Sequence, residues 1–285
     1  MFSEGMPLML SQAVVSGLLI GAVYALLALG LTLTFGVMHV INIAHGEMLM
    51  LGAYVSFWLF HLLGLNPLVA IVFAAPAMFV LGALMEKVVL ERIVEDIETT
   101  SLLVTFGISI CIINVAIWLW STDFKAIPFL TGSWLAGALV FPKSRLVGAA
   151  LALGFSLLVF LFLKFSRLGK AIRATSNSHD LAATCGVYVK RIYFITFGLA
   201  SALGAAAGAL ASIMFAIYPE MGPTFLMRSF TVIVLGGMGS VLGAMLGGML
   251  LGLTEGVGSL FLSGEGGGAI TYVILLLVLL FRPAG

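Results

Sequence analysis

Runs of about 20 apolar residues recur along almost the entire chain, and no other feature restricts its fold as strongly. An apolar helix of this length crosses the hydrocarbon core of a bilayer. Of the 285 residues, 62% are hydrophobic and only 9% are charged, which excludes an ordinary soluble domain and a disordered chain. The sequence therefore predicts an all-α, polytopic membrane protein without a separate soluble domain.

The apolar runs predict about eight hydrophobic helices, because each run is long enough to form most of a membrane span. They cover residues 9–35, 46–62, 67–86, 101–121, 146–164, 192–216, 229–253 and 268–281. The last run is short for a complete crossing. The short alternating segments of an outer-membrane barrel are missing from the sequence.

Residues 30–54 interrupt this apolar pattern with a concentration of polar side chains and glycines. The polar residues are His39, Asn42, His45 and Glu47, and the glycines include Gly36, Gly46 and Gly52. Polar side chains at membrane depth face protein or water, and irregular backbone is tolerated there only under the same cover. We therefore predict a discontinuous helix near the bilayer midplane, with a half-helix that begins at residues 44–46.

A second glycine-rich segment has a related pattern. Residues 44–54 (AHGEMLMLGAY) align with residues 235–245 (LGGMGSVLGAM), which pairs Gly46 with Gly237. The similarity is either a weak internal repeat or a chance match. Paired glycine-interrupted segments are typical of transport sites. We predict discontinuous or half-helices near 36–62 and 229–253. The predicted translocation-path residues are Asn42, His45, Gly46, Glu47, Gly236, Gly237, Gly239 and Ser240.

Several of these residues also have a purely structural interpretation. His45 and Glu47 either line the path or join two helices, and the second is favoured because a neutral or zwitterionic solute needs few fixed charges. Asn42 is expected to cap the half-helix rather than to present its amide to solute. The glycines are expected mainly to allow close helix packing. Glu255 either lines a gate or is a snorkelling end residue. No metal site is predicted.

The distribution of Lys and Arg predicts the orientation, because these residues favour the cytoplasmic side. Residues 164–191 carry six of them and residues 122–145 carry three. We expect the first segment to be a cytoplasmic loop and the second a periplasmic loop. The side of the N-terminus stays open: it is outside if residues 46–62 cross the membrane and inside if they re-enter.

The predicted cytoplasmic loop has helical spacing of its apolar residues, followed by a break near residues 176–180. Ser178 or Asp180 is a plausible cap for a second short helix, and Gly186 fits the end of that helix. An amphipathic unit at this position is either a docking element for a partner or a solvated connector. Residue spacing favours neither alternative.

Five segments together resemble the LivH-type permease family of ABC importers for branched-chain amino acids. Residues 35–54 contain a sequence similar to the Asn-x-Ala-His-Gly-Glu signature of that family, and residues 24–36 resemble its first helix. Residues 169–187 resemble its cytoplasmic loop, and residues 218–248 its late Leu-Gly-Gly-x-Gly-Ser motif. Phe281-Arg282-Pro283 resembles the C-terminal motif, although the chain ends sooner than is usual in the family.

The resemblance implies a single transmembrane permease domain over residues 1–285, in the inner membrane of a bacterium. It implies four partner proteins: a second, homologous permease, two cytoplasmic ATP-binding subunits and a periplasmic solute-binding protein. The chain would not be an enzyme and would bind no cofactor, because its partners would use the ATP. ATPase docking is expected at Gly169, Arg173, Asp180, Ala183 and Gly186.

The solute is predicted to be a branched-chain or other hydrophobic amino acid, because the signature fits and the membrane-embedded surfaces are apolar. Related permeases carry urea, short amides or other small organic solutes, which remain alternatives. A stand-alone channel or secondary carrier is a further alternative. A proton-coupled carrier should show several buried carboxylates, whereas Glu47 is the main candidate here.

Overall fold

The computed structural model describes residues 2–93, 96–261 and 266–281, so Arg282 and Pro283 of the C-terminal motif lie outside the described residues. Within these ranges the chain forms α-helices, one short 3-10 turn (Leu90–Arg92) and one hairpin. The helices are α1 (Phe2–Met38), α2 (His45–Leu63), α3 (Ile71–Val88), α4 (Ile97–Trp120), α5 (Lys143–Phe165), α6 (Arg167–Asn177), α7 (His179–Thr184), α8 (Val189–Ala211), α9 (Met221–Gly236), α10 (Val241–Gly258) and α11 (Gly266–Phe281). The hairpin pairs β1 (Ser133–Ala136) with β2 (Leu139–Pro142) in antiparallel register.

The all-α membrane fold is confirmed. In the described residues, seven helices are long and apolar enough to cross a membrane, namely α1, α2, α3, α4, α5, α8 and α10. The segment 229–253 is discontinuous, as predicted, and consists of two helices, the first of which begins earlier than expected, at Met221. The interruption follows from Gly237 and Gly239, whose φ angles of 90° and 85° are readily adopted only without a side chain.

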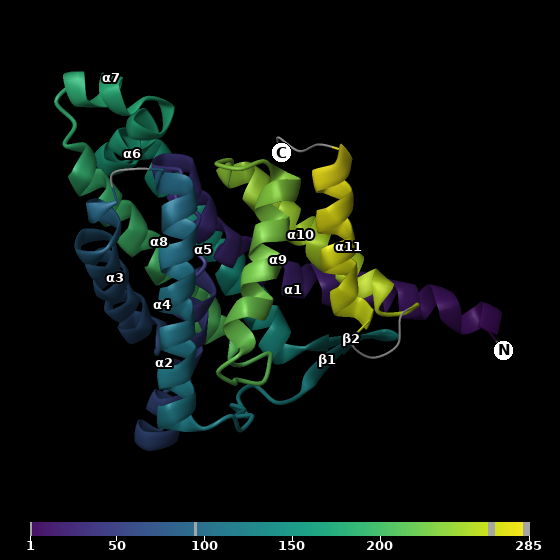
Figure 1. Cartoon of the computed structure of the whole chain (residues 1–285). Helices are drawn as coiled ribbons and strands as arrows, with labels where there is room; N and C mark the ends of the chain where they lie inside the picture. The colour runs from purple at the N-terminus through teal and green to yellow at the C-terminus, as the bar shows by residue number, and fades with distance from the viewer. Residues whose placement is uncertain (1, 94–95, 262–265, 282–285) are drawn as a thin grey trace.

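The two ends of the bundle carry different elements, as Figure 1 shows, with α6 and α7 at one end and the hairpin towards the other. Helix α1 connects these ends. Near its start, the Gln12 side chain donates to the Val140 carbonyl and accepts from the Val140 N–H, both at 2.8 Å. Near its end, the Ser176 hydroxyl of α6 donates to the Gly36 carbonyl. The N-terminal part of α1 therefore lies on the hairpin side, as expected if α2 crosses the membrane.

Burial separates the inner helices from the outer ones. Within the apolar windows of the two helices, 78% of α8 is buried but only 17% of α4. The outer face of α4 presents large apolar side chains, including Trp118 at 83% exposure. Because apolar surface of this size is unfavourable in water, this face is suited to lipid or to another membrane subunit.

Small residues allow α1 and α10 to pack backbone against backbone. A Cβ atom built on Gly248 would lie 2.5 Å from the Ala25 N atom, and one on Gly256 would lie 2.8 Å from the Gly17 Cα. Gly252 packs against Gly17 and Gly21 in the same way. Such contacts replace the hydrophobic driving force that helices lack in lipid. The close contacts of α10 with α1 thus continue from Gly248 to Gly256, towards the hairpin side.

Candidate translocation site

The first helix break joins α1 to α2 and is held by α4. The helix α1 ends at Met38, His39 has a positive φ of 53°, and α2 begins at His45. The Thr105 hydroxyl accepts from the Ile43 N–H at 3.1 Å, and the nearest acceptor for its single hydrogen is the Ser101 carbonyl at 2.7 Å, with the Ile41 carbonyl at 3.2 Å. The bond from Ile43 satisfies a backbone N–H that has no helical partner. The predicted start at residues 44–46 is confirmed, but α2 has 19 residues and is long and apolar enough to cross a membrane, so it is longer than the predicted half-helix.

Removal of the Thr105 hydroxyl should destabilise this break. In Thr105→Val, the Ile43 N–H loses its partner, and a buried unpaired backbone group costs about 1–3 kcal/mol. We expect a lower melting temperature of the detergent-solubilised protein and less uptake. The control is Thr254→Val, because among the described residues the Thr254 hydroxyl bonds only to the Leu251 carbonyl of its own helix. Equal melting temperatures for both variants would contradict the role of Thr105.

His45 ties α2 to α1. Its side chain is fully buried, and Nε2 donates to the Leu27 carbonyl over 3.0 Å. Gly30 leaves space for the ring, since a Cβ atom there would lie 2.6 Å from the His45 Cε1 atom. Interhelical hydrogen bonds in membranes contribute about 0.6 kcal/mol on average. This geometry favours the interpretation of His45 as a connection between helices.

Glu47 lies deeper in the bundle, between α4 and α9. Its Oε1 accepts from the Ser109 hydroxyl at 2.9 Å, and Ser109 is near the middle of α4. Its Oε2 has no partner among the described residues. Gly222, in the first turn of α9, leaves room for the carboxylate. A carboxyl group at a helix N-terminus interacts favourably with the helix dipole. Glu47 therefore lies closer to the middle of the bundle than the break itself.

Asn42 does not cap α2 with its side chain, so this prediction is wrong. The Asn42 backbone carbonyl accepts from the His45 N–H at 3.3 Å, and α2 has no side-chain cap. The side chain is buried, and neither its oxygen nor its nitrogen has a partner among the described residues. The main chain turns tightly enough at this break to make the bond that the side chain was expected to make.

The second helix break separates α9 from α10, and its glycines have distinct roles. Gly236 packs against Gly243 of α10, and a Cβ atom built on Gly36 would lie 2.9 Å from the Gly239 Cα. The prediction of close packing is wrong for Gly237, since a Cβ atom built there would meet no atom of the described residues within 4 Å. Its positive φ is what requires glycine. Ser240 caps α10 by accepting from the Gly243 N–H at 3.0 Å.

The proposed internal repeat does not hold in its residue register. Gly46 is in the first turn of α2 and packs against the Gly222 carbonyl, whereas its aligned partner Gly237 lies outside a helix. The two sets of predicted path residues also lie apart. Gly46 and Glu47 meet the first turn of α9, and Gly236 ends that helix. Gly236 follows Gly222 by 14 residue steps of helix, which span about 21 Å.

The predicted docking residues divide into buried and exposed positions on α6 and α7. Ser166 and Ser178 cap these helices by accepting from the Gly169 and Leu181 N–H groups at 2.8 and 3.3 Å. Gly169 is buried against α5, so it serves packing. The other predicted docking residues are exposed: Arg173, Asp180, Ala183 and Gly186.

One polar cluster was missed by sequence reasoning. Glu255 is neither a snorkelling end residue nor alone, because Arg228 Nε donates to its Oε1 over 3.0 Å. Arg228 was overlooked because residues 221–228 were not predicted to be helical. The available signal was an isolated cation within an otherwise apolar segment, which is costly in a membrane and therefore usually has a partner.

Comparisons with known proteins agree with this architecture. The profile of the family described as branched-chain amino acid transport system / permease component matches residues 13–281. The high-affinity branched-chain amino acid transport system permease protein BraD of Pseudomonas aeruginosa is 33% identical over 96% of this chain and 94% of its own length. The corresponding LivH of Escherichia coli is 31% identical over 96% of this chain and 94% of its own length.

A more distant relative has the same extent. The probable branched-chain amino acid transport permease protein LivH of Methanocaldococcus jannaschii is 28% identical over 91% of this chain and 87% of its own length. Among solved structures, PsaBC from Streptococcus pneumoniae in complex with Fab is similar with a TM-score of 0.49 and 18% identity, over 95% of this chain and 91% of that chain.

Proposed function

The chain belongs to the family of branched-chain amino acid transport permeases, and on this premise we propose that it is the membrane-spanning subunit of an ATP-driven importer of branched-chain amino acids. It is a transport subunit in a multi-pass membrane protein fold. The proposed location is the bacterial inner membrane. Residues 1–285 would act as one permease domain, with residues 164–191 in the cytoplasm and residues 122–145 in the periplasm.

The observation that carries this proposal is the contact between the α6–α7 unit and both helix breaks. Ser176 of α6 bonds to the Gly36 carbonyl, and Gly36 packs on Gly239 of the second break. The rings of His179 and His39 lie 6.0 Å apart. A displacement of α6 by a partner would therefore move the ends of α1 and α10 together. This is the arrangement that an alternating-access device needs.

ATP would be hydrolysed by partner subunits rather than by this chain. A phosphate-binding loop requires Gly-x-x-x-x-Gly-Lys followed by Ser or Thr. The Gly169-Lys170 pair of this sequence is followed by Ala171. Two cytoplasmic ATP-binding subunits are proposed to dock on the exposed side of α6 and α7, where Leu181 and Tyr188 are 68% and 69% exposed. A second homologous permease would cover an apolar helix face, and a periplasmic binding protein would contact the hairpin side.

Charge reversal on the α6–α7 unit should prevent docking without unfolding the chain. In the double variant Arg173→Glu/Asp180→Lys, we expect the ATP-binding subunits to be lost from the purified complex. Both residues are exposed, and the Arg173 contact to the Lys164 carbonyl, at 3.2 Å, is itself exposed. The measurement is the amount of ATP-binding subunit per permease after affinity purification. Asp123→Lys, an exposed charge change on the hairpin side, is the control. Undiminished association in the double variant would reject this docking surface.

The proposed function itself is tested by isolating the tagged protein gently from its native membrane. We expect a second permease and two ATP-binding subunits to co-purify. With the binding protein added, leucine, isoleucine or valine should raise ATP hydrolysis in proteoliposomes, and urea or acetamide should not. If urea or acetamide stimulates ATP hydrolysis and the branched-chain amino acids do not, the solute is a small amide or urea instead. Purification of the chain alone, under conditions that preserve other membrane complexes, would favour a channel or carrier instead.

A further inference from the structure

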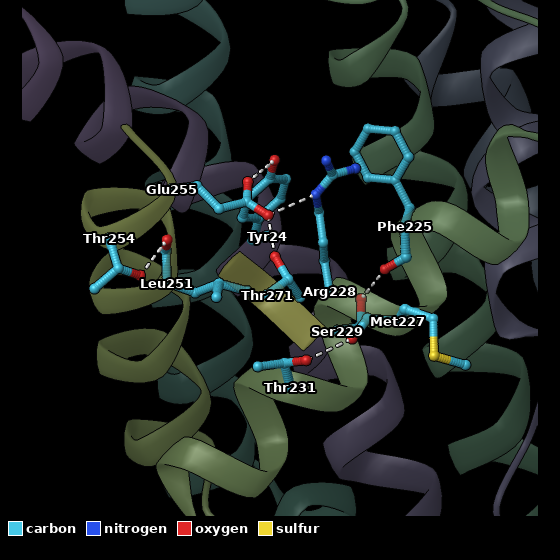
Figure 2. Close-up of polar contacts among 10 residues, drawn as sticks. All are labelled: Tyr24, Phe225, Met227, Arg228, Ser229, Thr231, Leu251, Thr254, Glu255 and Thr271. Carbon is cyan, nitrogen blue, oxygen red and sulfur yellow. Dashed lines mark hydrogen bonds and ion pairs between the residues drawn. The ribbon is translucent and has the colours of Figure 1, made fainter. Parts of the chain in front are cut away.

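Side chains from four helices meet in one polar cluster, which we call the Arg228 cluster. Glu255 of α10 is its centre, as Figure 2 shows. Its Oε1 accepts from Arg228 Nε of α9 at 3.0 Å and from the Thr271 hydroxyl of α11. Its Oε2 accepts from the Tyr24 hydroxyl of α1 at 2.8 Å. An ion pair of this kind is costly to retain in an apolar bundle, which makes it a candidate functional site.

The guanidinium of Arg228 has unused binding capacity. It has five N–H donors, and among the described residues only Nε makes a hydrogen bond. The Tyr24 and Phe225 rings lie 5.3 and 5.4 Å from its Cζ atom and restrict its position. The side chains of Arg228 and Glu255 are 20% and 12% exposed, so both are accessible to a small molecule. A guanidinium presented in this way is suited to a bidentate contact with a carboxylate.

The accessible part of the cluster lines a cavity of about 660 Å³. This volume lies within the range of about 300–1,000 Å³ that is usual for small-molecule sites. Leu8 and Ile20 of α1 and Phe215 supply apolar walls, and Val140 of the hairpin lines the same cavity. The cavity thus combines two cations, Arg228 and Arg145, with one anion, Glu255, and an apolar wall.

We propose that this cavity is a solute site for a zwitterionic α-amino acid with an apolar side chain. The solute carboxylate binds the free N–H groups of Arg228, its ammonium binds the Glu255 carboxylate, and its side chain lies against Leu8, Ile20 and Phe215. In the absence of solute, Arg228 and Glu255 neutralise each other. When solute enters, each protein charge gains an opposite solute charge, so no buried charge is left uncompensated. This inference rests on the proposed function and names the place where the solute is held.

The alternative role of the cluster is a structural connection between α1, α9, α10 and α11. The two roles predict different ligand behaviour. A structural cluster has no preference among leucine, isocaproate, which lacks the ammonium, and isoamylamine, which lacks the carboxylate. A zwitterion site binds each of these half-ligands at least about tenfold more weakly than leucine, because one buried charge then lacks its new partner.

The experiment uses the purified permease complex in nanodiscs without the binding protein. Saturation-transfer NMR measures binding of L-leucine, isocaproate and isoamylamine. We expect L-leucine to bind with a Kd of about 1 mM, weak enough for release during transport. Binding should disappear in Ser16→Leu, which fills part of the cavity without changing the ion pair, and in Arg228→Met/Glu255→Gln. Glu91→Gln, which removes the exposed Lys190–Glu91 pair, should bind like the unchanged protein.

Melting temperatures of all variants are measured in the same preparations, so that loss of binding is not mistaken for unfolding. Absence of leucine binding to the unchanged complex, equal affinities for the half-ligands, or full binding in the folded double variant would each overturn the proposal. Leucine-stimulated ATP hydrolysis with the binding protein present is recorded in parallel. If that stimulation persists without binding at this cavity, only the site assignment fails. If it is missing, the proposed function fails as well.

Discussion

Gly252→Leu is expected to prevent stable folding of the chain in the membrane. Gly252 packs against the backbone of α1, and a Cβ atom there would lie 2.6 Å from the Gly21 N atom. Only a shift of a whole helix could make room for leucine, because no flexible side chain can move away. Overpacking typically costs about 1–3 kcal/mol, and a contact between two backbones falls at or above the upper end of that range. The gap that opens would also weaken the adjacent contacts of Gly17 and Gly248.

Two quantities are measured for the protein in detergent. Size-exclusion chromatography gives the amount of monodisperse protein, and thermal unfolding gives its melting temperature. Gly154→Leu is the matched control, because Gly154 is also in a helix, α5, but a Cβ atom built there would meet no atom of the described part of the chain within 4 Å. We expect a nearly unchanged profile for the control and mostly aggregated protein for Gly252→Leu. A folded Gly252→Leu protein with an unchanged melting temperature would refute the close packing of α1 on α10.

Arg228→Met is expected to cause the second large effect, by leaving Glu255 without its cation. Removal of one partner from a buried ion pair typically costs about 3–5 kcal/mol, because an uncompensated charge remains. Glu255 keeps the bonds from Tyr24 and Thr271, and the pair is partly exposed, so a value near the lower end is expected. We expect solute uptake and the melting temperature of Arg228→Met both to decrease.

The double variant Arg228→Met/Glu255→Gln separates the charge from the packing. Glutamine still accepts hydrogen bonds from Tyr24 and Thr271 but carries no charge. We therefore expect the melting temperature to recover most of the loss seen in Arg228→Met, while uptake stays low. A double variant less stable than either single variant would show that Arg228 and Glu255 stabilise the fold independently. Glu91→Gln is again the control, since the Lys190–Glu91 pair is exposed and such pairs contribute about 0–1 kcal/mol.

The sequence predicted most helices because the signal for a membrane span is local. Length and apolar composition place α4 at Ile97–Trp120, close to the predicted 101–121, and α5 at Lys143–Phe165, close to 146–164. Local turn chemistry likewise predicted Ser178 or Asp180 as the cap of α7, of which Ser178 is the cap, and placed Gly186 just after the end of that helix, where φ is +83°. The hairpin was not predicted, because its strands are only four residues long.

The sites were predicted less completely than the helices. The polar segment at the first break was found because polar residues are conspicuous against an apolar background. The contacts of this segment with α4 were not predicted. Thr105 and Ser109, which make them, look like ordinary small polar residues in an apolar run. The two predicted groups of path residues were treated as one site, yet they meet opposite ends of α9.

The sequence by itself therefore determined the class of protein, its family and the approximate position of both helix breaks, because hydrophobic length, glycine content and motifs are properties of neighbouring residues. Only the tertiary structure decided which side chains meet. The Tyr24 hydroxyl bonds to Glu255 across 231 positions of sequence, and Arg228 reaches the same carboxylate from a third helix. Such contacts depend on how helices pack and tilt, which no local pattern specifies. The Arg228 cluster and its cavity exist only once α1, α9, α10 and α11 are in place.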